Sequence, residues 1–238
     1  MISRAAETDR CVRNMSKSGA ARSSLAFLFD LDGVIVHSNP VHSLCWREYL
    51  GGFGVEPPED FDELMYGRRN DDIVRLVFGA GLDEAEVLRR GAEKEALYRK
   101  MMAPVLKQRL VAGLPQFLER HREVPKAVAT NGERANMEFI LTGSGLAGHF
   151  QAALNGGDIS RPKPDPEIYL RAAEMLSVPP EYCIVFEDSH AGVQAARAAG
   201  ARVVGITTTH DWLPGAALCV PDFADPELEH WLSTQSQS

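Results

Sequence analysis

The chain has 238 residues, of which 45% are hydrophobic and 24% charged, a balance that is ordinary for a globular protein with a sizeable buried core. Its formal net charge of −8 excludes a general nucleic-acid or acidic-membrane binder, because such proteins need an excess of basic residues. The four cysteines lie far apart, which predicts neither a CxxC metal pair nor a dense disulfide framework and favours the reducing cytoplasm.

Both ends of the chain have the composition of polar tails. Residues 1–24 hold five arginine or lysine side chains and no continuous apolar stretch, so neither a secretory signal nor a membrane anchor is expected there. Residues 233–238 are equally polar. We therefore predict an unstructured tail at each end of a folded region.

The first predicted strand covers Leu25–Phe29 and leads into Asp30, Asp32 and Gly33. Carboxylates two positions apart on an extended backbone point to one face, so this pair can supply a nucleophile, a metal ligand and an acid or base. The structural alternative is an Asp-Gly turn that closes a strand, which is common. The segment alone favours neither.

A stretch of roughly 80 residues without a convincing strand follows, which is far longer than the usual βα loop. Its apolar periodicity predicts helices over His42–Leu50, Asn70–Phe78 and Asp83–Met102. We expect residues 34–112 to form a helical cap inserted above the carboxyl edge of the sheet, where ligands of open α/β folds bind.

The second predicted strand, Lys126–Ala129, ends in Thr130 and Asn131 ahead of a helix. A hydroxyl and free backbone N–H groups at the start of a helix make an anion site. The alternative, that Thr130 or Asn131 only caps the helix, is favoured for this segment taken alone.

Prolines then hold Lys163 in an extended turn before a helix predicted over Pro166–Leu176. A fixed ammonium at this position can neutralise Asp30 and a bound phosphoryl group. The alternative is a lysine that is merely solvated, as most lysines in proline-rich surface loops are.

The strand predicted over Cys183–Phe186 places Glu187 and Asp188 at its end. An acid pair at a strand end suits an oxygen-ligated cation such as Mg²⁺. The competing account makes Asp188 the N-cap of the helix predicted over Ala191–Ala199.

Two further strands are predicted at Arg202–Ile206 and Ala217–Val220. Alternation of apolar strands with helices predicts an α/β fold, a doubly wound, Rossmann-like parallel sheet covered on both faces. We assign residues 25–33 and 113–232 to this core, and the inserted α-helical cap subdomain lies between them.

The four strand-end segments, taken together, resemble the haloacid dehalogenase superfamily, specifically its phosphatase and β-phosphoglucomutase-like members with a helical cap. The match rests on the DLDGV run at Asp30, the Thr130 turn, the Lys163 segment and the EDS run at Asp188. These occur in the family's order and approximate spacing, and the resemblance spans about residues 25–223.

The resemblance implies that Asp30 attacks phosphorus to form an aspartyl-phosphate, while Asp32 protonates the leaving oxygen and then activates the acceptor. It implies Mg²⁺ held by Asp30, the backbone carbonyl of Asp32 and Asp188, with Glu187 in or near that shell. The residues implied to bind the transferring phosphoryl group are Thr130, Asn131 and Lys163. Dehalogenases of the family lack an aspartate at the position of Asp32, so phosphate-ester chemistry is implied.

The cap residues that the resemblance implies near the substrate are His42, Arg68, Arg69, Asn70 and Lys94. Asn70 aligns with an arginine that holds the non-transferring phosphate in the mutase, which favours a phosphatase over a mutase. The alternatives are that His42 is a satisfied helix residue and that the cationic residues form a solvated face. His37 replaces an aspartate common in this branch, and nothing in the sequence explains the change.

The leading hypothesis is therefore a Mg²⁺-dependent phosphatase for a small phosphomonoester such as a sugar phosphate. The second is a β-phosphoglucomutase-type hexose-phosphate mutase, and the third is a non-catalytic sugar-phosphate binder, disfavoured because no motif residue is missing. The expected partner is a small phosphorylated metabolite, not a nucleic acid or a membrane, and a monomer is compatible with the sequence.

Overall fold

The computed structural model describes residues 25–65 and 68–235, so the predicted tail over residues 1–24 lies outside the described residues. Its centre is a six-stranded sheet with the order β3-β2-β1-β4-β5-β6, in which every neighbouring pair is parallel. The strands are β1 Ala26–Phe29, β2 Lys126–Ala129, β3 Ala152–Leu154, β4 Cys183–Glu187, β5 Arg202–Ile206 and β6 Leu218–Val220. This arrangement confirms the predicted doubly wound α/β fold.

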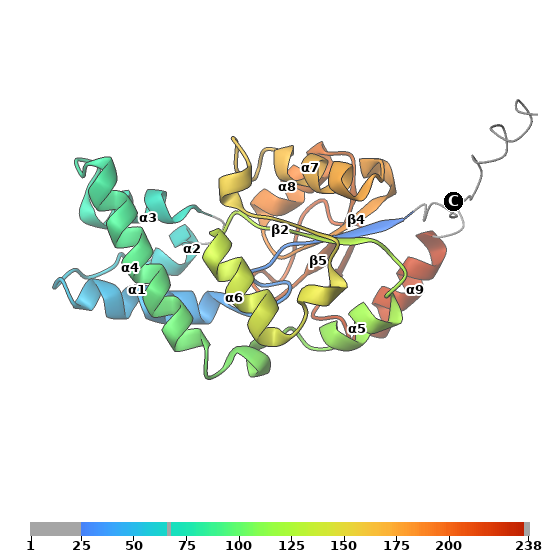
Figure 1. Cartoon of the computed structure of the whole chain (residues 1–238), viewed down its shortest axis with the longest axis horizontal. Coiled ribbons are helices and arrows are strands. Elements are labelled where there is room, and N and C mark those ends of the chain that lie inside the picture. Colours follow the sequence, from blue (N-terminus) through green and yellow to red (C-terminus); the bar gives the residue numbers. More distant parts are fainter. Residues whose placement is uncertain (1–24, 66–67, 236–238) are drawn as a thin grey trace, which may run out of the picture.

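Helices cover both faces of the sheet, as Figure 1 shows. They are α5 Leu114–Arg120, α6 Arg134–Ser144, α7 Glu167–Leu176, α8 His190–Ala198 and α9 Pro226–Gln235. Helices α7 and α8 pack on one face, whereas α5, α6 and α9 pack on the other. No helix among the described residues is long and apolar enough to cross a membrane.

The strands supply apolar side chains to both faces because successive residues point to opposite sides of a sheet. Phe27 and Phe29 of β1 face α5 with Phe186 of β4, whereas Ala26 and Leu28 face α7 and α8. The Phe29 and Phe186 rings stack with centroids 4.8 Å apart. Burying each such ring contributes about 2 kcal/mol, so the centre of the sheet provides a rigid base for the loops at its carboxyl edge.

The segment between β1 and α5 forms a helical lobe beside the sheet (Figure 1). Its helices are α1 Asn39–Gly51, α2 Phe61–Met65, α3 Asn70–Phe78 and α4 Glu84–Met102. The outer half has its own apolar cluster around Trp46 and Phe61, whereas Tyr98 and Met102 of α4 join the core cluster of the sheet. The boundaries at residues 34 and 112 stay predictions.

Two linkers connect this lobe to the sheet and run side by side. Val36 and Leu110 form an antiparallel bridge, and the His37 N–H donates to the Arg109 carbonyl at 2.7 Å. The chain therefore leaves the core and returns to it at adjacent points.

The structure corrects two predictions made from the sequence. It contains a strand, β3, that was not predicted, because three residues are too short to give an apolar pattern. The tail predicted from residue 233 is also wrong in part, since α9 continues to Gln235. Arg202 donates to the Gln235 side chain at 2.6 Å and holds this last turn on the sheet.

Candidate active site

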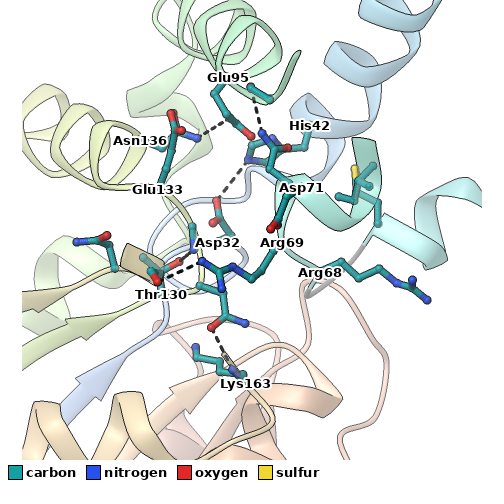
Figure 2. Close-up of a pocket in the computed structure, with 18 of the residues that line it drawn as sticks. Asp32, His42, Arg68, Arg69, Asp71, Glu95, Thr130, Glu133, Asn136 and Lys163 are labelled. Carbon is teal, nitrogen blue, oxygen red and sulfur yellow. Dashed lines mark hydrogen bonds and ion pairs between the residues drawn. The ribbon is translucent and has the colours of Figure 1, made fainter. Parts of the chain in front are cut away.

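The site lies above β1 and β4, where the strand order changes direction and open α/β sheets bind ligands. A cavity of about 760 Å³ opens there between the sheet and the helical lobe. All twelve residues predicted for the site line this cavity: Asp30, Asp32, His42, Arg68, Arg69, Asn70, Lys94, Thr130, Asn131, Lys163, Glu187 and Asp188. Figure 2 shows the cavity with ten of its lining residues labelled.

Asp30 follows β1 directly and is fixed by the neighbouring strand, because its N–H donates to the Phe186 carbonyl at 3.0 Å. The Lys163 ammonium contacts the Asp30 carboxylate at 2.5 Å and the Glu187 carboxylate at 2.7 Å. Its third donor hydrogen reaches the Ala129 carbonyl at 2.9 Å. Lys163 is only 7% exposed, so the alternative of a solvated lysine is wrong.

Glu187 is fully buried, and both of its oxygens are occupied by donors. One oxygen accepts from Lys163 and from the Tyr169 hydroxyl at 2.9 Å. The other accepts from the Asp188 N–H and from both the N–H and the hydroxyl of Ser189. This geometry does not support the prediction of Glu187 as a metal ligand; it makes Glu187 the residue that fixes Lys163.

Asp188 points toward Gly33, and that glycine is required for the approach. A Cβ atom at position 33 would lie 1.8 Å from the Asp188 Oδ2 atom, and Gly33 has a φ of +80°. The same Oδ2 accepts from the Thr209 hydroxyl and, at 3.4 Å, from Asn39. The N-cap of α8 is Ser189, whose hydroxyl accepts from the Gly192 N–H, so the alternative of an Asp188 cap is wrong.

The charge balance of this group fits a divalent cation. Burial raises the pKa of Asp30 to about 8, against the opposing effect of Lys163. Burial and the Glu187 charge also raise the pKa of Asp188 well above its usual range. No three His, Cys, Asp or Glu side chains of the described chain form a complete metal cage. Mg²⁺ does not need one, because it keeps several waters and takes one or two carboxylates.

Asp32 has a different environment from Asp30. Its Oδ1 accepts from the Ser38 hydroxyl at 2.6 Å and lies 3.7 Å from the His42 Nε2. Burial acts to raise the pKa of Asp32, but His42, Ser38 and the nearby Lys94 charge outweigh it, so the pKa is lowered. Ser38 is the N-cap of α1 but makes no side-chain capping bond, and its backbone is already helical, with φ −88° and ψ −26°. Its hydroxyl donates to Asp32.

The loop after β2 lies beside both aspartates and is tied to the Lys163 loop. Thr130 is buried, and its hydroxyl accepts from the Gly132 N–H at 3.0 Å. The Asn131 side chain accepts from the Lys163 N–H at 3.1 Å. Helix α6 has Glu133 as its N-cap, so the alternative that Thr130 or Asn131 caps this helix is wrong.

The lobe contributes His42 and Lys94, which contact each other. The Lys94 ammonium lies 2.8 Å from the His42 Nδ1, and the His42 ring stacks on Tyr98 at 3.7 Å. Lys94 is only 2% exposed and pairs with Glu95 at 2.7 Å. The alternative of a solvated cationic face is therefore wrong for Lys94.

The three consecutive residues at the start of α3 point in different directions. The Arg69 side chain points toward the Thr130 loop and donates to the Gly156 carbonyl at 3.4 Å. Arg68 also lines the cavity, but it is exposed and its side chain extends away from the Thr130 loop (Figure 2). Asn70 donates to the Gly91 carbonyl of α4 at 3.1 Å, so its side chain links α3 to α4. Arg69, not Asn70, presents its side chain to the site.

The residues of this arrangement that were not predicted from the sequence include Ser38, Asn39, Glu95, Asn136, Tyr169 and Thr209. Ser38 carries one usable signal, since a serine before Asn-Pro is typical of a helix start. Glu95 and Asn136 are 41 positions apart and carry none.

Comparison with known proteins points to the same family as the residues gathered in this site. A family model described as haloacid dehalogenase-like hydrolase matches residues 25–200. Validoxylamine A 7'-phosphate phosphatase of Streptomyces hygroscopicus subsp. limoneus is 35% identical over 77% of this chain and 86% of its own. The fructose-1-phosphate phosphatase YqaB of Escherichia coli is 30% identical over 75% of this chain and 94% of its own.

Among solved structures, β-phosphoglucomutase from Clostridium difficile superposes with a TM-score of 0.78 at 25% identity, covering 89% of this chain and 96% of its own. The similar proteins thus include both phosphatases and a mutase.

Proposed function

The chain belongs to the haloacid dehalogenase-like hydrolase family, and from that premise we propose that it is a Mg²⁺-dependent phosphatase acting on a small phosphomonoester, with a sugar phosphate as the favoured class. The family consists of phosphoric monoester hydrolases and phosphomutases. We infer in addition a bound Mg²⁺, a sugar-phosphate substrate, a cytoplasmic location and the roles of the individual residues given below.

The observation that carries the proposal is the contrast between Asp30 and Asp32. Two carboxylates two residues apart have pKa values shifted in opposite directions, Asp30 upward by burial and Asp32 downward by its donors. These directions belong to the site without its ligands, and each would be opposed when the site is filled: a cation beside Asp30 favours its carboxylate, and a phosphoryl dianion beside Asp32 favours its protonated form. Asp30 faces Lys163, whereas Asp32 faces the lobe through which a leaving group must extend.

In the proposed reaction an Asp30 oxygen attacks phosphorus, a P–O bond to Asp30 forms, and the ester P–O bond breaks. Asp32 gives its proton to the departing oxygen, and a dianionic phosphoryl group nearby favours the protonated form that this requires. Asp32 then takes a proton from water as that water attacks the aspartyl-phosphate, and phosphate leaves. Lys163 and the Thr130 loop bind the phosphoryl oxygens throughout.

Mg²⁺ would be held by Asp30, the Asp32 carbonyl and Asp188, where it would reduce repulsion between the nucleophile and the phosphate. Asp188 supports this assignment because both of the hydrogen bonds described for its carboxylate go to Oδ2. The other oxygen, Oδ1, would then be the metal ligand.

The test is a screen of phosphate esters with and without Mg²⁺ that scores both phosphate release and isomer formation, with Asp30→Asn as the control. Phosphate release that needs Mg²⁺ and Asp30 supports the proposal. Absence of release from every ester in a broad panel contradicts it.

A hexose-phosphate mutase is the second candidate, and Arg69 is the observation that favours it. The sequence argument against a mutase depended on Asn70, but Arg69 supplies a cation to the cavity from the same turn. Conversion of β-glucose 1-phosphate to the 6-phosphate with a bisphosphate primer, at a rate above phosphate release, would identify a mutase.

A further inference from the structure

A continuous series of hydrogen bonds runs from the core helix α6, through the lobe, to the neighbourhood of Asp32. The Asn136 amide of α6 donates to one Glu95 oxygen at 2.6 Å, and the other Glu95 oxygen accepts from Lys94 at 2.7 Å. Lys94 in turn lies 2.8 Å from the His42 Nδ1, and the His42 Nε2 lies 3.7 Å from Asp32. Glu95, Asn136, His42 and Asp32 are labelled in Figure 2.

The donors in this series have only one consistent direction. Arg99 donates to the Asn136 carbonyl oxygen at 2.7 Å, so the Asn136 amide nitrogen must face Glu95. A lysine ammonium has only donors, and His42 Nδ1 must therefore accept from Lys94. A neutral His42 then carries its proton on Nε2, the nitrogen that faces Asp32.

The members are shielded from water, which strengthens each contact. Lys94, Glu95 and Asn136 are 2%, 5% and 6% exposed. Burial acts to raise the pKa of Glu95, but Lys94 outweighs it and the pKa is lowered, so Glu95 is the anion that balances the Lys94 charge. Cys45 donates to the Lys94 carbonyl at 3.3 Å and fixes this turn of α4 further.

We propose that Glu95 and Asn136 are positioning residues for the proton transfer by Asp32. They act only when the lobe meets the core, because Asn136 belongs to α6 and Glu95 to α4. Glu95 holds Lys94, Lys94 orients His42, and His42 faces Asp32 and fixes its orientation. The inference rests on the proposed function, since it concerns the leaving-group step of that reaction.

The experiment compares kcat/KM for two esters, because this quantity reports the steps up to cleavage of the ester bond. An alkyl phosphate needs a proton on its leaving oxygen, whereas 4-nitrophenyl phosphate releases a stable anion and needs little help. The variants are Glu95→Gln and Asn136→Ala. The matched control is Glu93→Gln on the same helix. The Glu93 carboxylate accepts from the Tyr49 hydroxyl at 2.7 Å, and Glu93 does not line the cavity.

We expect both variants to lose about tenfold or more in kcat/KM for the alkyl ester but less than about threefold for the nitrophenyl ester, as a defect in general acid catalysis predicts. Glu93→Gln should keep the wild-type kcat/KM for both esters. Thermal unfolding of each variant accompanies the kinetics, and Glu95→Gln, which keeps the side-chain shape, carries the test if Asn136→Ala fails to fold.

Equal losses for the two esters, or no loss for either, overturn the positioning role while leaving an active phosphatase. A wild-type protein that releases phosphate from no ester of the broad panel overturns the proposed function and this inference with it. The two failures are therefore distinguishable.

Discussion

The sheet side and the lobe side of the cavity hold their charges in different ways. On the sheet side, one ammonium, Lys163, faces Asp30 and Glu187, and Asp188 lies close to both. On the lobe side, Lys94 is paired with a single carboxylate, Glu95. The sheet side therefore has an excess of negative charge that a cation can neutralise, whereas the Lys94 charge on the lobe side is balanced by its neighbour Glu95.

This difference assigns separate tasks to the two sides. Unneutralised carboxylates on a rigid sheet edge suit metal binding and attack on phosphorus, which every phosphate ester requires. Self-balanced charges on helices can orient a proton donor and contact the rest of a substrate without depending on the metal. Variants on the two sides should accordingly fail in different ways.

The largest effect is expected from Asp30→Asn, which removes the proposed nucleophile from the sheet side. Turnover should fall on the order of 10⁴-fold or more, as when the nucleophile of a covalent mechanism is deleted. Folding should be intact, because burial disfavours the Asp30 carboxylate and the amide has no such cost. Phosphate release and a thermal unfolding curve measure the two quantities, and an active variant would remove the assignment.

Lys163→Met should leave the sheet-side carboxylates without their cation. We expect a loss of about 3 kcal/mol in the free energy of unfolding, the lower end for a broken buried ion pair, because Asp30 can take up a proton. The control is Lys126→Met, a buried lysine that donates to backbone carbonyls and has no carboxylate of the described residues at hydrogen-bond distance. Urea denaturation should show the smaller loss for Lys126, about 1 kcal/mol, and equal losses would contradict the charge argument.

Arg69→Ala tests the lobe side against its neighbour Arg68→Ala. Arg69 points toward the Thr130 loop and Arg68 extends away from it, so removal of Arg69 should raise KM about tenfold or more while Arg68→Ala changes it little. Steady-state kinetics with the best ester of the panel is the measurement. Equal effects of the two variants would show that substrate does not reach this turn.

The smallest effect is a pH-dependent stabilisation by Mg²⁺. The pKa of Asp30 is raised from 3.8 to about 8. Between these two pKa values the folded protein binds a proton that the unfolded chain has released. The stability of the metal-free protein therefore falls as the pH rises from the lower value to the higher one. Mg²⁺ competes with this proton and should raise Tm by a few degrees more near about pH 8 than near about pH 5.5.

Thermal unfolding with and without Mg²⁺ at the two pH values measures this difference. The lowered pKa of His37 makes stability rise with pH, which is the opposite of the Asp30 effect. This contribution is the same with and without Mg²⁺, so it cancels when the two Tm values are compared. Asp188→Asn should remove the difference. A Mg²⁺ shift that is the same at both pH values would contradict a cation bound by these carboxylates.

The sheet side could be predicted from the sequence, and the lobe side only in part. Asp30, Thr130 and Asp188 each follow an apolar strand, and parallel strands end at one edge, so strand ends alone bring them together. The lobe residues lie on helices whose rotation decides which of two neighbours faces the cavity. Arg69 and Asn70 differ by one position, and spacing could not identify Arg69 as the one that faces it.

The pairing between Glu95 and Asn136 lay beyond prediction for a further reason. It joins α4 to α6, and such contacts depend on how two helices cross after folding, which neither local periodicity nor a motif records. The buried Tyr169 hydroxyl at Glu187 is a similar case, since its place in the sequence is that of an ordinary core aromatic.

The paired linkers at Val36 and Leu110 make the lobe a replaceable module. A chain that leaves and re-enters a domain through bonded neighbours closes its loop at the bridge, and the closure cost then grows only slowly with the length of what is inserted. The sheet edge can thus keep its strand-end residues while lobes of different size are exchanged above it. For an engineer, that bridge is the natural point at which to graft a new specificity domain, and the new domain must again orient Asp32 as His42 and Lys94 do here.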